Sequence, residues 1–354
     1  MINIDNGKKA CIFYCRPGFE PDIVSELRSF VRTDELPDSA IQTAEGFVTL
    51  LDVERAMSSR LSQHSWMFAR QLLQDCQLLN ELPVADRVSA ITAHLKLLNW
   101  TFSDIFLETP DTNDGKSLAG LFKKMSGHLD RAIEVAQLID KNSPYRLHLF
   151  FLSGTQVWIG RTLVAHSNPW LMGIPRLRLP PNAPSRACMK LEEALSTLLT
   201  TDDQKRLLKP GMKVVDLGAA PGGWTWQMVR RNMFVTAVDN GPMNKELMAT
   251  GQVEHARADG FKFKPRKKVN WFLCDIVDKP ARVAQLVADW VKNGYSDNYI
   301  FNLKLPMKKR VDEIEKCKEK IVLAMPKNRK YKFVIKQLYH DRQEVTCFLS
   351  LAAG

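Results

Sequence analysis

Three glycines between a predicted strand and a predicted helix are the first sign of chemistry in this sequence. The strand, residues 213–217, is apolar and β-branched, and the helix is expected over residues 224–231. Gly218, Gly222 and Gly223 lie in the turn between them. Such a turn lets backbone N–H groups approach a ligand closely, and the helix start adds a positive dipole end. The pattern indicates a site for a nucleotide-like ligand.

Acidic residues follow three successive predicted strands after this turn: Asp239, Asp259 and Asp275. A single aspartate at such a place is as well explained by a helix cap or a turn. Three of them after a glycine turn favour a ligand crevice, and Asp239 is placed to bind ribose hydroxyls. The glycine spacing matches neither G-x-G-x-x-G nor a Walker-type phosphate loop, so both of those sites are excluded.

The charge balance points to a polyanionic partner. The 354 residues hold 50 Lys and Arg against 39 Asp and Glu, a net charge of +11, which favours nucleic acid or an anionic membrane face. One basic run is often only a solvated face. Three runs in the half that holds the glycine turn favour a phosphate-binding surface; they cover residues 262–268, 308–310 and 327–332.

The seven cysteines are scattered, without C-x-x-C or zinc-type spacing, so we expect free thiols, no metal site and a reducing, cytoplasmic location. No apolar run approaches the roughly 18 residues of a membrane span, and residues 1–9 have no signal segment, so no membrane partner is expected. The absence of a strong heptad pattern favours a monomer.

A proline-rich break at residues 179–184 divides the chain. Before it, short strands and helices alternate as α+β modules, with a strand expected over 65–73 and a single helix over 116–135. After it, strands and helices alternate from residue 213 onward, which predicts an α/β, doubly wound, mostly parallel sheet. The last two strands, 330–339 and 344–351, are joined too tightly for a parallel crossover and predict an antiparallel hairpin.

Residues 216–224, Asp-Leu-Gly-Ala-Ala-Pro-Gly-Gly-Trp, resemble the S-adenosylmethionine (SAM) loop of FtsJ-type RNA ribose 2′-O-methyltransferases. Further pieces match that family in order: Ser185 to Leu191, Asp275, Lys304 within Asn302 to Leu305, and Glu344. Together, Lys190, Asp275, Lys304 and Glu344 look like the Lys-Asp-Lys-Glu tetrad of the family. The resemblance implies a Rossmann-like methyltransferase domain with SAM as cofactor.

The longer N-terminal half is similar to members of this family that modify a cytidine ribose in 23S ribosomal RNA. The resemblance implies a ferredoxin-like domain over residues 1–62, a THUMP-like RNA-binding domain over 63–168, a proline-rich linker over 169–184 and the methyltransferase domain over 185–354. The target nucleotide follows from the resemblance alone, and both free RNA and a precursor particle remain open as the substrate.

The resemblance also assigns the cofactor contacts. Ala220, Pro221, Gly222 and Gly223 are implied at the methionine and ribose of SAM, with Gly218 and Trp224 in the same loop. Asp239 is implied at the ribose hydroxyls, Asp259 at the adenine amine and Asp275 near the sulfonium. Where the family can carry a serine this sequence has Ala187, so a contact there comes from the backbone or from Ser185.

The chemistry of the tetrad residues agrees with ribose methylation. A 2′-hydroxyl is a poor nucleophile and needs help in losing its proton. A lysine accepts that proton only if its pKa is lowered by desolvation or by a second cation. We therefore expect Lys304 to be the general base, Asp275 to orient it, and Glu344 to fix Lys190 or the hydroxyl. Taken singly, each lysine is more often a surface side chain and Glu344 an edge-strand cap, but Lys304 stands out because it lies inside the apolar run 299–305.

Other functions are weighed against this one. A nicotinamide oxidoreductase lacks its glycine fingerprint here. Methylation of an exocyclic amine or of cytosine C5 is disfavoured, because the chain has neither an Asp/Asn-Pro-Pro-aromatic box at Asp275 nor any Pro-Cys pair. A non-catalytic RNA-binding or ribosome-assembly factor that retains the SAM fold stays open as the alternative.

Overall fold

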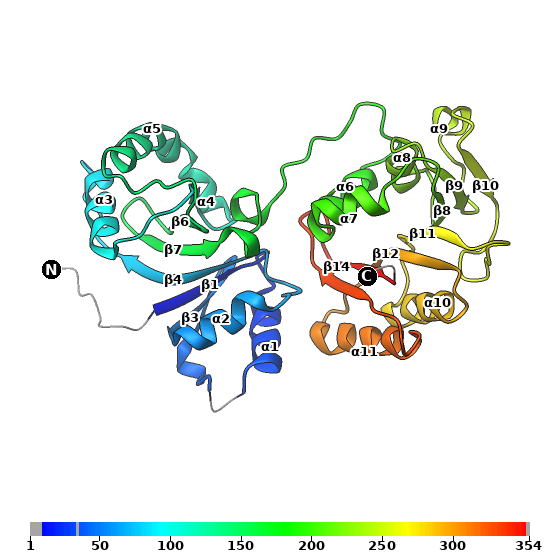
Figure 1. Ribbon diagram of the computed structural model, residues 1–354, viewed down its shortest axis with the longest axis horizontal. Coiled ribbons are helices and arrows are strands. Elements are labelled where there is room, and N and C mark those ends of the chain that lie inside the picture. The colour runs from blue at the N-terminus through cyan, green and yellow to red at the C-terminus, as the bar shows by residue number, and fades with distance from the viewer. Residues whose placement is uncertain (1–8, 33–34, 352–354) are drawn as a thin grey trace. The chain divides into compact units, whose positions relative to one another are not determined.

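The computed structural model describes residues 9–32 and 35–351, and the chain divides into two compact units at Pro175 and Arg176. This boundary falls inside the expected linker, residues 169–184. The two units are described separately (Figure 1).

The N-terminal unit is built on one seven-stranded sheet in the order β2-β3-β1-β4-β7-β6-β5. Neighbouring strands are antiparallel except β5 and β6. The boundary expected between residues 62 and 63 falls at the end of a helix, and strands from both sides of it share this one sheet, since β4 pairs with β1 and with β7. The strands are β1 (Lys9–Tyr14), β2 (Ile41–Ala44), β3 (Phe47–Val53), β4 (Gln71–Leu79), β5 (Asp104–Glu108), β6 (Tyr145–Phe151) and β7 (Val157–Leu163).

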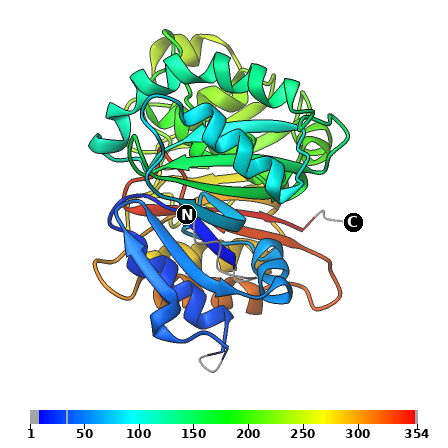
Figure 2. The same cartoon turned by 90° about the vertical axis from the view of Figure 1, so that its left-hand side faces the viewer.

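Helices cover both faces of this sheet. Figures 1 and 2 show α1 and α2 on one face and α3 and α5 on the other. The single helix expected over 116–135 is two helices that meet at Leu118, because Thr112 caps a separate first turn. The strand expected over 65–73 begins only at Gln71. The helices are α1 (Glu20–Phe30), α2 (Arg55–Gln63), α3 (Arg87–Leu98), α4 (Asn113–Ser117) and α5 (Ala119–Val135), with 3-10 turns η1 (Asp38–Ala40), η2 (Val164–His166) and η3 (Leu171–Gly173).

The C-terminal unit has the predicted α/β sheet, in the order β10-β9-β8-β11-β12-β14-β13. Its first five strands are parallel, and the order reverses between β8 and β11. The predicted hairpin of β13 and β14 is confirmed, and β14 inserts between β12 and β13, antiparallel to both. The strands are β8 (Lys213–Leu217), β9 (Phe234–Val238), β10 (Val253–Ala256), β11 (Val269–Cys274), β12 (Ser296–Lys304), β13 (Lys332–Lys336) and β14 (Glu344–Ser350).

Helices α6 and α8 lie on one face of this sheet and α10 and α11 on the other (Figure 1). Two helices, α6 and α7, precede β8, where no element was expected. A Thr200–Asp203 capping box begins α7, whereas α6 has no side-chain cap. The helices are α6 (Ala187–Leu198), α7 (Thr201–Leu207), α8 (Gly223–Val229), α9 (Lys245–Ala249), α10 (Pro280–Lys292) and α11 (Arg310–Leu323).

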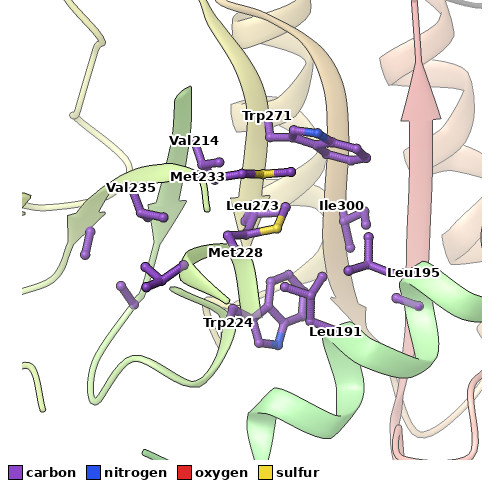
Figure 3. Close-up of a cluster of buried hydrophobic side chains, with 14 of the residues drawn as sticks. Leu191, Leu195, Val214, Trp224, Met228, Met233, Val235, Trp271, Leu273 and Ile300 are labelled. Carbon is purple, nitrogen blue, oxygen red and sulfur yellow. The ribbon is translucent and has the colours of Figure 1, made fainter. Parts of the chain in front are cut away.

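An apolar core joins α6 and α8 to the sheet (Figure 3). Trp224 and Met228 of α8 pack with Leu191 of α6 against Leu273 and Ile300 of the central strands. The indole of Trp224 is only 2% exposed. The core therefore fixes α6 and the start of α8 at the carboxyl ends of β8 and β11, where ligands bind in open α/β sheets.

Candidate active site

The loop between β8 and α8 has a backbone path that only glycine follows without strain. Gly218 has φ +77° and Gly222, the N-cap of α8, has φ +117°. A Cβ atom on Gly218 would lie 2.7 Å from Ile276 Cγ1, and one on Gly222 would lie 2.5 Å from Leu247 Cδ2. The peptide bond between Ala220 and Pro221 is cis. The loop is thus packed closely on the segments that follow β11 and β9.

Asp239, at the end of β9, closes this loop. Its Oδ2 accepts a hydrogen bond from the Ala220 N–H at 3.0 Å, and its Oδ1 accepts one from the Gly241 N–H at 2.7 Å. The side chain stays partly exposed, and each carboxylate oxygen has a second lone pair. Asp239 therefore shapes the loop and retains acceptor capacity for hydroxyl groups.

Ser185 and Gly223 meet where the segment before α6 crosses the loop. The Ser185 hydroxyl oxygen is buried and has no hydrogen-bond partner among the described residues. A Cβ atom on Gly223 would clash with this oxygen. An unsatisfied hydroxyl and a glycine cradle at the helix start fit a polar ligand such as SAM.

Two residues of the expected cofactor set lie differently from the others. The Trp224 side chain points into the core, where it packs with Leu191 and Met228 (Figure 3). Asp259 is exposed and lies beyond the end of β10, where its Oδ1 accepts the Phe261 N–H at 2.9 Å. Asp259 therefore acts as a turn residue, which was the alternative to a role in ligand binding.

The four tetrad residues come together from four elements. Lys190 of α6 places its Nζ 3.4 Å from Asp275 Oδ1, just beyond β11, and forms a salt bridge with Glu344 at the start of β14. The register of β12 and β14 sets Lys304 directly opposite Glu344. The insertion of β14 beside β12 therefore brings Glu344 into the site.

One pairing differs from the expected one. Asp275 was expected to orient Lys304, but it forms a salt bridge with Lys190 and accepts a hydrogen bond from Asn302 Nδ2 at 2.8 Å. Lys304 is exposed, and its ammonium has no salt bridge or hydrogen bond within residues 9–32 and 35–351. Lys304 is the last residue of β12, whereas Lys190 reaches Asp275 from helix α6.

The two carboxylates beside Lys190 determine its charge. Burial alone would lower the pKa of Lys190, but the carboxylates of Asp275 and Glu344 outweigh it, and the pKa of Lys190 is raised. Burial raises the pKa of Asp275, and Lys190 opposes that shift only in part. Lys190 is therefore a protonated lysine at neutral pH and is unsuited to accept a proton.

A second buried carboxyl group lies beneath the loop. Asp216, at the end of β8, accepts the Thr225 hydroxyl at 2.6 Å through Oδ2, while Oδ1 is buried and has no partner among the described residues. Burial is the main cause that raises the pKa of Asp216 to about 7.

Asn302 and Thr346 adjoin the site, although the sequence reasoning did not single them out. Asn302 lies two residues before Lys304 on β12, and Thr346 two residues after Glu344 on β14. Alternation along a strand puts each on the same face as its tetrad neighbour. A polar residue at this spacing inside an apolar strand was the signal available.

All seven cysteines are free, as predicted, and all of them are buried. No cluster of three or more His, Cys, Asp or Glu side chains that could hold a metal ion is found within residues 9–32 and 35–351. No helix in the described part is long and apolar enough to cross a membrane.

The fold and this site define a SAM-dependent methyltransferase, and residues 183–350 match the FtsJ-like methyltransferase family. Residues 86–163 match the N-terminal model of ribosomal RNA large subunit methyltransferase M. The enzyme of that name from Cellvibrio japonicus is 46% identical over 342 residues, which is 95% of this chain and 97% of that protein. This chain therefore belongs to the ribosomal RNA large subunit methyltransferase M family, and the resemblance seen in its motifs is confirmed.

A second relative and a solved structure are also similar to this chain. The Xanthomonas axonopodis pv. citri protein of the same name is 44% identical over 338 residues, 94% of this chain and 96% of that one. Among solved structures, TrmN from Thermus thermophilus is similar at 16% identity and a TM-score of 0.35, covering 97% of this chain and 99% of that one.

Proposed function

We propose that this enzyme transfers the methyl group of SAM to the ribose 2′-oxygen of a cytidine in 23S ribosomal RNA, with Lys304 as general base. The observation that carries the proposal is the convergence of two lysines and two carboxylates at the ends of β11, β12 and β14. The names of the relatives support ribosomal RNA of the large subunit as the substrate.

The different partners of the two lysines support the assignment of Lys304. Asp275 and Glu344 hold the Lys190 ammonium in its charged form, so it is suited to orient the hydroxyl by donating hydrogen bonds. The Lys304 side chain is exposed and has no such carboxylate contact in the described part of the chain. Bound SAM supplies an electrophilic methyl group on a positively charged sulfonium.

The cofactor residues follow from the loop. Ser185, Gly218, Ala220, Pro221, Gly222 and Gly223 surround the position proposed for the methionine and ribose of SAM, with Asp239 at the ribose hydroxyls. For Trp224, whose side chain is buried, the proposed contact is through its backbone. Asp259 is proposed at the adenine amine and Asp275 near the sulfonium.

The N-terminal unit is proposed to bind RNA, through a ferredoxin-like part over residues 1–62 and a THUMP-like part over 63–168. The family match over residues 86–163 supports this role. The net charge of +11 fits a partner whose phosphates contribute affinity. A cytoplasmic monomer that acts on free RNA or on a precursor particle completes the proposal.

The test is transfer of labelled methyl from SAM to large-subunit RNA from cells that lack this enzyme. The label is then mapped as alkali-resistant dinucleotides, which form only when a 2′-oxygen is methylated. Wild type should label one ribose, and Lys304→Ala should not, while both bind SAM. Lys292→Ala is the matched control, because Lys292 is exposed at the end of α10 beside the amino edge of β12.

Two results would contradict the proposal. If the label were found on a base, the enzyme would be a base methyltransferase and not a ribose methyltransferase. SAM binding without transfer to free RNA or to particles would favour the non-catalytic RNA-binding factor.

A further inference from the structure

A chain of hydrogen bonds leads from Asp275 into the core of the C-terminal unit. Asn302 Nδ2 donates to Asp275 Oδ1 at 2.8 Å. Thr346 Oγ1 lies 2.8 Å from Asn302 Oδ1 and 2.6 Å from Asp341 Oδ2. Thr346 and Asp341 are both 0% exposed. The chain therefore connects the carboxylate of the active site to a carboxyl group that has no access to water.

The number of available protons sets the direction of this chain. Asp275 forms the carboxylate half of an ion pair with the Lys190 ammonium and faces the Asn302 amide, and as a carboxylate it can only accept. Asn302 must then turn its NH₂ group toward Asp275 and its carbonyl oxygen toward Thr346. Thr346 has a single hydroxyl proton, which it donates to Asn302. The contact between Thr346 and Asp341 is left without a proton unless Asp341 supplies it.

The surroundings of Asp341 favour its protonated form. Burial and then Glu344 are the largest causes that raise the pKa of Asp341 well above its usual range. Glu344 and Glu193 face it with negative charge, and Lys190 is the cation that acts on it. Its Oδ1 is buried and has no partner among the described residues. Its Oδ2 accepts only the Leu338 N–H, at 3.3 Å, besides the Thr346 contact, so a carboxylate in this position would have most of its charge uncompensated.

The connection between β13 and β14, which carries Asp341, is held in place. Glu193 of α6 accepts hydrogen bonds from the N–H groups of Tyr339 and His340 at 2.6 and 2.8 Å, and it lies 2.6 Å from His340 Nδ1. Glu193 lies one helical turn after Lys190 on the same helix. The same helix thus fixes both ends of the chain, and Asp341 is kept in the core.

We propose that Asp341 is a positioning residue that stays protonated and, through Thr346 and Asn302, holds Asp275 as an ionised acceptor for Lys190. This arrangement keeps Lys190 in its charged form and leaves proton removal to Lys304. The inference rests on the proposed function for its effect on catalysis, whereas the protonation of Asp341 is independent of it.

The kinetic test compares variants that keep or remove each donor. Thr346→Val keeps the shape but cannot donate, and we expect kcat to fall about 10-fold to 100-fold with the Kd for SAM unchanged. Thr346→Ser and Asp341→Asn keep a donor and should retain kcat near that of wild type. In Thr346→Val the Asp275 carboxylate loses support, so the acid limb of the pH–rate profile should move to higher pH.

Asp275 also faces Glu344 and Asp216, which do not change in these variants. Loss of activity in Asp341→Asn equal to that in Thr346→Val would overturn the proposal, because it would require an ionised Asp341. Full activity of Thr346→Val with an unshifted pH profile would do the same. SAM affinity and urea unfolding show whether each variant is folded.

Infrared spectroscopy provides a readout that does not depend on activity. The difference spectrum between wild type and Asp341→Asn at neutral pH should contain the C=O band of a protonated carboxylic acid. Absence of that band overturns the proposal. A protein that shows the band but does not methylate ribose contradicts the proposed function and supports the protonated Asp341.

Discussion

The two units each bury a carboxylate network, and the networks differ in how completely their polar atoms are paired. In the N-terminal unit, Glu108 accepts the Tyr14 hydroxyl at 2.9 Å and the Met172 N–H, and it lies 2.7 Å from His148 Nδ1. His148 Nε2 in turn lies 2.9 Å from Thr162 Oγ1. Glu108 and His148 are at most 1% exposed. Every partner in this network is supplied by the protein.

Each unit has buried polar atoms without partners in the described part of the chain, but in the C-terminal unit some of them lie beside the glycine loop. Ser185 Oγ and Asp216 Oδ1 are buried and unpaired beside the glycine loop, and the Lys304 ammonium is exposed at the end of β12. Buried polar groups are normally paired, and the exceptions call for an explanation. The comparison indicates that the closed network stabilises its unit, whereas the open one reserves hydrogen-bonding capacity for a ligand.

The largest expected effect is on catalysis, from a change at Lys304 in the C-terminal unit. Lys304→Ala should lower kcat about 10³-fold, as removal of a general base does, and should leave the melting temperature near that of wild type because the side chain is exposed. Single-turnover methyl transfer and calorimetry measure the two quantities. If Lys304→Ala were as active as the control Lys292→Ala, Lys304 would not be the general base.

The fully paired network of the N-terminal unit should affect stability and not catalysis. Glu108→Ala leaves Tyr14, His148 and Met172 with unpaired polar groups, so the free energy of unfolding should fall by about 3 kcal/mol. Urea unfolding monitored in the N-terminal unit measures it. The folded fraction should still bind SAM with unchanged Kd. A loss of SAM affinity would show that the network serves the site as well.

The unpaired, buried carboxyl group of Asp216 should make stability depend on pH. Its folded pKa of about 7 lies above the usual value near 4. Between these values the folded chain keeps a proton that the unfolded chain has lost, so stability falls as pH rises from about 4 to about 7. Asp216→Asn should remove this loss, a difference of about 4 kcal/mol over the whole pH range. The same difference in free energy of unfolding between wild type and Asp216→Asn at pH 5 and at pH 8, measured by urea titration, would contradict it.

The smallest effect concerns the loop backbone. Gly222→Ala imposes strain at φ +117° and a clash with Leu247, so SAM should bind about 10-fold more weakly. Titration calorimetry measures the affinity. Gly251→Ala is the matched control, since Gly251 also has positive φ but open space around it. Equal losses in both variants would assign the effect to general destabilisation.

Local patterns predicted the parts of the site that follow from neighbouring residues. The glycines between 218 and 223 and the acids at strand ends indicated the loop and its crevice, and the short connection before Glu344 predicted the hairpin. Helix α6 was missed because no side-chain cap marks its start. It is nevertheless the helix that positions Lys190.

The remaining features depend on contacts between distant elements. The insertion of β14 between β12 and β13 is a choice of strand order, which periodicity does not encode. The pairing of Asp275 with Lys190 follows from where α6 packs. Trp224 lies within the recognised loop motif, but its side chain is in the core, so membership of a motif did not indicate which way the side chain points.

The position of β14 also sets when the enzyme becomes complete during its synthesis. Chains fold from the N-terminus as they leave the ribosome, and β13 has no neighbour in the sheet until β14 is present, because β14 separates it from β12. The nascent chain therefore exposes the edge of β12 and lacks Glu344 until residues 344–350 emerge. Closure of that edge and assembly of the tetrad are then a single event.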